Sequence, residues 1–143
     1  MLEYSLAISF SIFVAPYIHE GSHWFIGWLG KSMPEFEYVL WIFPNGVHHR
    51  EIKTMDSTII RFSGVSPLLW IPVALLAIIL FIMERSPSSL FMMSAFTLSI
   101  LMSTKSDALA FREPEKYREK VLYGEISREP LLLPDLPKWI PRI

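Results

Sequence analysis

Two histidines and a glutamate stand close together near the start of the chain, in the order His19-Glu20-Gly21-Ser22-His23. Residues four apart on an α-helix lie on nearly the same face, so both imidazoles can reach one metal ion. Glu20 is rotated by about 100° from His19 and can lie beside an open position on the metal. This spacing is typical of catalytic zinc sites in which the glutamate is the general base for a water molecule. The pattern predicts His19 and His23 as ligands and Glu20 as the base.

Composition places the chain among integral membrane proteins. Of its 143 residues, 52% are hydrophobic, the mean hydropathy is +0.37, and the apolar residues gather in blocks. The absence of cysteine excludes disulfides and thiolate ligands, so any metal must be held by nitrogen and oxygen. The net charge of −1 gives no indication of a nucleic-acid partner.

Three segments are apolar enough to predict transmembrane helices, at about residues 4–30, 62–83 and 88–110. We therefore expect a mainly α-helical, polytopic membrane protein with the lipid bilayer as its surroundings. Its embedded core would cover residues 1–110, and residues 111–143 would form a charged, proline-rich tail. Histidine and glutamate inside a span are costly unless they have partners and a role. The alternative is that the three side chains hydrogen-bond to one another as a purely structural contact.

Between the first two spans, residues 36–52 predict a small β-hairpin. Residues 36–43 are rich in aromatic and β-branched side chains, Pro44-Asn45-Gly46 predicts a turn, and residues 47–52 predict the return strand. His48 and His49 would point to opposite faces of that strand. One is expected to face the metal site and the other solvent. The alternative is a polar loop at the membrane surface.

Asp107 is the only acidic residue of the third segment. A lone buried carboxylate is costly and needs a partner, while the histidine pair needs a third ligand. The simplest solution to both requirements is that Asp107 completes the metal site. Alternatively, Asp107 lies at the membrane surface or pairs with Lys105.

The positive residues predict the orientation in the cell membrane. One loop holds Arg85 alone, whereas Lys31, Arg50, Lys53 and Arg61 lie on the other side with the basic residues of the tail. The positive-inside rule then places the N-terminus outside and the hairpin and C-terminus in the cytoplasm.

Taken in order, these features resemble the site-2 protease family of intramembrane zinc metalloproteases. The histidine motif on a span, the following hairpin, the Ser-Gly-Val-Ser-Pro-Leu run at 63–68 and Asp107 match the order of the family's core, over about residues 5–110. The resemblance implies Zn²⁺ held by His19, His23 and Asp107. It also implies an endopeptidase that cleaves a membrane-protein substrate near the cytoplasmic side, with Glu20 as its base.

The last motif departs from the family pattern. The family commonly has Asn-x-x-Pro-Asp-Gly there, whereas residues 103–108 read Ser-Thr-Lys-Ser-Asp-Ala. The family's asparagine binds the substrate carbonyl or the oxyanion, and Ser103 takes its place. We therefore expect this hydrogen bond to come from Ser103, Asn45, His48 or His49.

Other functions remain open at this stage. The main alternative is a catalytically silent membrane adaptor, with a structural metal or none, that binds a partner through its hairpin and tail. A di-iron membrane oxidase is disfavoured because four histidines are too few. A metal transporter with three spans would need homo-oligomers to form a pathway. Leu131–Leu133 and Trp139 could also cover the site as a lid.

Overall fold

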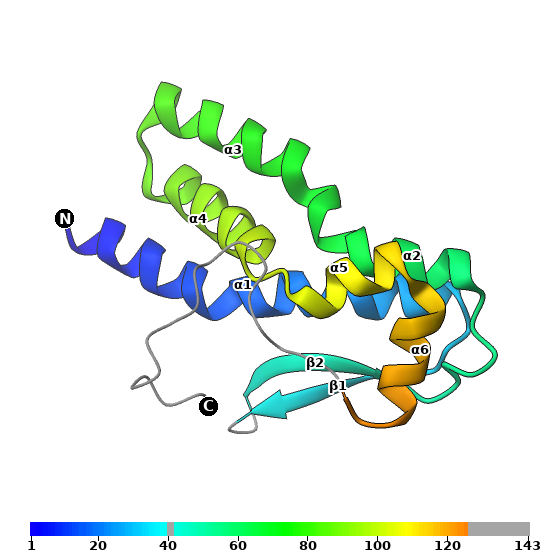
Figure 1. The fold of residues 1–143 in the computed structure, drawn as a ribbon. Helices are drawn as coiled ribbons and strands as arrows, with labels where there is room; N and C mark the ends of the chain where they lie inside the picture. Colours follow the sequence, from blue (N-terminus) through cyan, green and yellow to red (C-terminus); the bar gives the residue numbers. More distant parts are fainter. Residues whose placement is uncertain (40–41, 126–143) are drawn as a thin grey trace.

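The computed structural model describes residues 1–39 and 42–125, and it is mostly helical with one small sheet. Figure 1 shows α4 lying between α1 and α3, with the two strands on the opposite side of α1, and α6 contacts α2 and α5. In chain order the elements are α1 (Leu2–Leu29), β1 (Pro34–Val39), β2 (Phe43–His49), α2 (Ser57–Val65), the 3₁₀ helix η1 (Ser66–Trp70), α3 (Ile71–Glu84), α4 (Pro87–Leu101), α5 (Lys105–Arg112) and α6 (Pro114–Leu122). The predicted mainly helical fold with a hairpin between its first two helical segments is confirmed.

One face of α1 is buried along most of the helix. Its buried residues are Ser11, Ala15, His19, His23 and Gly27, each four residues after the last. Because this spacing puts them in one row, the small side chains allow α4 to approach and the two histidines lie in the same contact stripe. The helix continues through Pro16.

The hairpin exists, but the predicted turn at Pro44-Asn45-Gly46 is wrong. In the antiparallel pair Gly46 lies opposite Glu37 and Pro44 lies opposite Tyr38, so Asn45 is an extra residue in β2. Such a bulge accommodates Pro44, which has no N–H for the ladder, and moves the connection to the residues between Val39 and Phe43.

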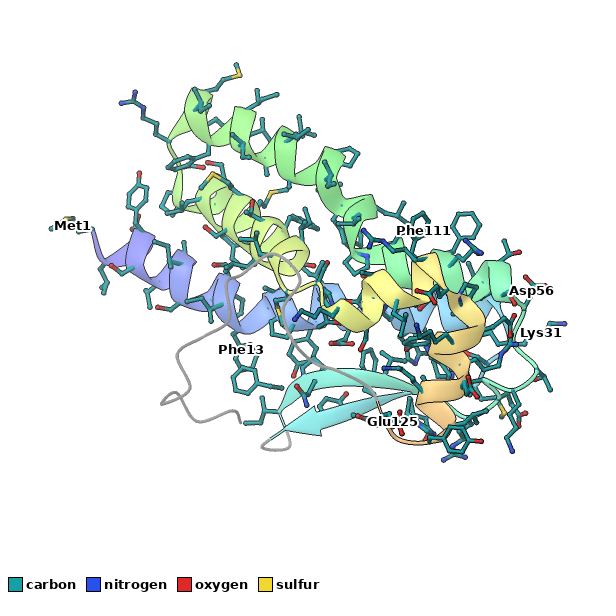
Figure 2. The ribbon with its side chains drawn as sticks, viewed as in Figure 1. Met1, Phe13, Lys31, Asp56, Phe111 and Glu125 are labelled. Carbon is teal, nitrogen blue, oxygen red and sulfur yellow. The ribbon has the colours of Figure 1, made fainter. Side chains whose placement is uncertain are left out.

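Aromatic side chains fix the hairpin against α1. Phe13 points from α1 toward the hairpin (Figure 2), and its ring centroid lies 5.0 Å from that of Phe43 in an edge-to-face contact. Trp24 stacks on Phe36 at 6.2 Å. Contacts at both ends of the hairpin hold it along the part of α1 that carries the histidines.

One helical segment of the described chain is long and apolar enough to cross a membrane. It runs from Ser57 to Glu84 through α2, η1 and α3, with a mean hydropathy of 2.6 over its most apolar window, only 22% of which is buried. The 3₁₀ turn η1, which contains Pro67, interrupts this segment between α2 and α3. α4 is apolar but shorter than a span.

The predicted third span at 88–110 is two helices rather than one. α4 ends at Leu101, and α5 begins at Lys105 after Thr104. The Thr104 side chain accepts from the Asp107 backbone N–H, and the Asp107 side chain accepts from the Thr104 N–H, so the pair caps a new helix. A reciprocal cap of this kind ends one helix and starts another, which the apolar pattern alone does not show.

The start of the predicted tail packs on the core. Tyr117 of α6 rests on a cluster formed by Met55, Ile60 and Ala110. Arg118 donates to the carbonyl oxygen of Ile52 at 3.1 Å and holds α6 against the connection after the hairpin. The proposed lid at Leu131–Leu133 and Trp139 lies outside the described residues.

We expect Gly64→Ala to destabilise the protein by about 1–3 kcal/mol, because it overpacks the contact between α2 and α5. A Cβ at Gly64 would press on the Asp107 carbonyl oxygen and lie 2.9 Å from both the Ala110 Cβ and the Phe111 N. The free energy of unfolding in mild detergent, followed by circular dichroism, measures the loss.

The matched control for that substitution is Gly21→Ala. No atom lies within 4 Å of a Cβ at Gly21, which is also within a helix. Alanine stabilises the interior of a helix by about 1 kcal/mol relative to glycine, so this variant should be as stable as wild type or more stable. A Gly64→Ala protein as stable as Gly21→Ala would contradict the close packing of α2 on α5.

Candidate metal centre

His19 and His23 face each other on the buried side of α1. Their exposed fractions are 2% and 7%, and their Nε2 atoms are 3.3 Å apart. The four-residue spacing therefore gives the predicted pair, with one ring nitrogen of each histidine directed at the same point.

Asp107 completes the group from α5. Its Oδ1 lies 3.4 Å from the His23 Nε2 and its Oδ2 lies 3.7 Å from the His19 Nε2. The three ligand atoms lie within 4.8 Å of one another. No other group of three or more acidic, histidine or cysteine side chains in residues 1–39 and 42–125 is placed to hold a metal ion. Ligands bound at about 2.0–2.1 Å in a tetrahedron are about 3.3–3.4 Å apart, close to these separations.

Hydrogen bonds around the histidines fix which nitrogen carries the proton. The His19 Nδ1 lies 2.8 Å from the Ser99 carbonyl oxygen, which can only accept, so Nδ1 is the donor. The Ser66 hydroxyl donates to the Ser63 carbonyl oxygen and therefore accepts from the His23 Nδ1 at 3.4 Å. Both Nε2 atoms then carry lone pairs toward the centre.

Three lone-pair atoms thus face one another in a buried space. Two imidazole nitrogens and a carboxylate within 3.3–3.7 Å repel unless a cation or a proton lies between them. The donor set, two neutral imidazoles and one carboxylate, is one that zinc and similar divalent metals accept. The residues present therefore fit a metal ion.

The carboxylate of Asp107 is held by the start of its own helix. Oδ2 accepts from the Thr104 N–H at 2.6 Å and from the Thr104 hydroxyl at 3.0 Å. These contacts, together with the histidine bonds to Ser99 and Ser66, orient each ligand before a metal binds.

A cavity of about 480 Å³ opens beside this group. Glu20 is half-buried and lines it, together with residues of the hairpin and α6. The cavity is large enough for water and a short length of peptide next to the ligands. Its lining residues are His19, Glu20, His23, Glu37, Asn45, Gly46, Val47, His48, His49, Ser63, Thr104, Ser106, Asp107, Tyr117, Val121 and Gly124.

The hairpin contributes three of the residues predicted to bind substrate. Asn45, the extra residue of β2, lines the cavity, and so do His48 and His49. The two histidines point to opposite faces as expected, since the side chain of His48 is 53% exposed and His49 is 5% exposed.

His49 and Ser103 are both engaged by neighbours. The His49 Nδ1 lies 2.7 Å from the Ser32 hydroxyl, and burial lowers the pKa of His49 from its ordinary 6.5 to about 4, so it is neutral at pH 7. The Ser103 hydroxyl donates to the Ile100 carbonyl oxygen at 2.9 Å. Ser103 is not among the residues that line the cavity.

Sequence reasoning missed several residues of this site. The pair Thr104 and Asp107 carries the spacing of a capping box, and that signal was available. Ser66 and the Ser99 carbonyl give no such signal, because their role depends on how the helices pack. Tyr117 lies in a charged segment that shows no sign of a buried site.

Comparisons with family models, with curated proteins and with solved structures found no match to this chain.

We expect Thr104→Ala to weaken zinc binding by about 10–100-fold, the usual cost of losing a group that orients a ligand. The variant removes the hydroxyl bonded to the Asp107 Oδ2. Isothermal titration of the metal-free protein with zinc measures the affinity.

Ser86→Ala is the matched control. Ser86 caps α4 through the same reciprocal arrangement with Ser89, and it does not line the cavity. Both variants should lose about 1 kcal/mol of stability, but only Thr104→Ala should lose zinc affinity. An equal zinc affinity in the two variants would contradict the orienting role of Thr104.

Proposed function

We propose that this protein is a zinc-dependent intramembrane endopeptidase of the site-2 protease type. The observation that carries the proposal is the convergence of the His19, His23 and Asp107 ligand atoms beside a cavity that Glu20 also lines. Three protein ligands next to an open space suit a catalytic metal, whereas structural zinc sites are usually closed by a fourth protein ligand.

The proposed chemistry is hydrolysis of a peptide bond. Bound zinc would act as a Lewis acid that polarises the carbonyl and lowers the pKa of water. Glu20 accepts the proton of the water that attacks the carbonyl carbon. It then passes that proton to the leaving nitrogen as the C–N bond breaks, which yields an amine and a carboxylic acid, and the acid releases its remaining proton to water.

The proposed substrate is a membrane-embedded segment. Its carbonyl groups are bonded within its own helix, so it must unwind before water can attack. The sheet of the described chain has two strands, and β2 carries most of the hairpin residues that line the cavity. An unwound segment could add to the hairpin as a further strand and present one carbonyl to the site.

The apolar surface supports a place in the bilayer. Large side chains of α3 such as Leu75, Ile79 and Ile82 are more than half exposed. α1 likewise exposes Leu6 and Phe10 on the half that precedes the histidines. We propose that α1 and the Ser57–Glu84 segment cross the membrane, and that the shorter α4 together with the residues after it returns the chain, with the N-terminus outside and the hairpin and C-terminus in the cytoplasm.

A catalytically silent adaptor is the second candidate. The engaged Ser103 hydroxyl favours it, because the residue that replaces the family's asparagine is bonded to Ile100 rather than directed into the cavity. Equal partner binding by the wild-type and Glu20→Gln proteins, with no cleavage product from either, would support this function.

We expect Glu20→Gln to retain zinc and to lower peptide cleavage by at least about 10²-fold, because an amide cannot accept the proton. The assay uses the purified protein in detergent, a library of quenched fluorescent apolar peptides, and metal analysis of the same samples. Glu3→Gln is the control, since Glu3 lies exposed in the first turn of α1. Undiminished cleavage by Glu20→Gln would rule out its role as the base.

A further inference from the structure

The proposed reaction needs a hydrogen-bond donor for the carbonyl oxygen, which becomes negatively charged during attack. Ser103 stands where the resemblance places this donor, but its hydroxyl is bonded to the Ile100 carbonyl oxygen. His49 is bonded to Ser32 through its Nδ1, and His48 pairs with Glu37 at 4.0 Å. Asn45 of β2 lines the cavity and offers one donor, and α6 contributes another lining residue with a donor group.

Tyr117 is placed to supply it. It lies in the middle of α6 and lines the same cavity as the ligands and Glu20. Its ring rests on the cluster of Met55, Ile60 and Ala110, which fixes the direction of the side chain. Within residues 1–39 and 42–125 no hydrogen bond joins its hydroxyl to another residue.

The surroundings of the hydroxyl keep it protonated. Burial, and then the negative charges of Asp107, Glu20 and Glu37, raise the pKa of Tyr117 above its ordinary value of 10. Tyr117 lines the cavity together with Asp107, Glu20 and Glu37. A protonated phenol beside the metal ligands can donate to an oxygen that gains charge.

We propose that the Tyr117 hydroxyl donates a hydrogen bond to the carbonyl oxygen of the peptide bond under attack, in place of the asparagine found in the resembling family. This proposal rests on the proposed peptidase function. It makes Tyr117 a catalytic residue, although the sequence predicted that this part of the chain belongs to a cytoplasmic tail. The position of α6 is held by Arg118, whose side chain bonds to the Ile52 carbonyl oxygen.

The test compares Tyr117→Phe with wild type in two assays on the full chain loaded with zinc. Phenylalanine keeps the ring and its packing, so folding and zinc content should not change. With the fluorescent peptides, kcat should fall by about 10²–10³-fold while KM stays nearly constant, which is the cost of losing one such donor. Tyr123→Phe is the control, since Tyr123 is 74% exposed just after the same helix.

The second assay does not depend on turnover. Acetohydroxamate binds zinc through a charged oxygen and a carbonyl oxygen, and its affinity is measured by calorimetry. Tyr117→Phe should weaken its binding by roughly tenfold or more, as expected for a hydrogen bond to a charged group. Tyr123→Phe should bind like wild type.

The outcomes separate the two proposals. Equal kcat and equal hydroxamate affinity in Tyr117→Phe and wild type would overturn the role of Tyr117 while leaving the peptidase intact. Weaker hydroxamate binding in Tyr117→Phe, with no peptide cleaved by wild type, would support the donor and contradict the peptidase. A wild-type protein that binds no zinc would overturn both.

Discussion

Three electron-pair donor atoms, from His19, His23 and Asp107, converge inside this helix bundle. The packing around them depends on keeping these atoms together. Two imidazole nitrogens and a carboxylate oxygen lie within 4.8 Å of one another beside the cavity. Such a group is unstable as a set of acceptors alone and is stabilised by a shared cation. The buried row on α1, the cap at the start of α5 and the serines near His23 all keep these atoms in place.

Small residues make this arrangement possible. Gly64 allows the backbone of α5 to lie directly against α2, and α5 carries Asp107 to the histidines. Gly27 similarly leaves room for the His49 ring, which ties the hairpin to α1 near the cavity. Close contacts at the two glycines therefore hold α5 against α2 and the hairpin against α1. Bulky side chains at these points would move the residues of the site apart.

Much of the site could be predicted because it depends on local helix geometry and on a segment that contains a single acidic residue. The spacing of His19 and His23 follows from helix geometry, and Asp107 was the one acidic residue available in its segment. The existence of the hairpin followed from its residue types, but its turn did not. The register that makes Asn45 a bulge depends on pairing with β1, which outweighs the turn preference of Pro44-Asn45-Gly46.

The parts that could not be predicted depend on tertiary packing. The break between α4 and α5 occurs where a polar cap outweighs continuing apolar character, so residues 88–110 do not form one helix. Tyr117 lies in a segment of charged residues, and only the docking of α6 on Met55 and Ile60 brings it to the cavity. The assignment of Ser103 as a donor rested on alignment with a motif, whereas the structure directs its hydroxyl to the Ile100 carbonyl.

The zinc content of the purified protein tests the central claim most directly, measured by mass spectrometry of the metal in wild type, His23→Ala, Asp107→Ala and His48→Ala. We expect about one zinc per chain in wild type and in His48→Ala, whose imidazole is exposed, and almost none in the other two. Zinc retained by Asp107→Ala, or a wild-type protein that takes up no zinc when it is supplied, would contradict the three-ligand centre.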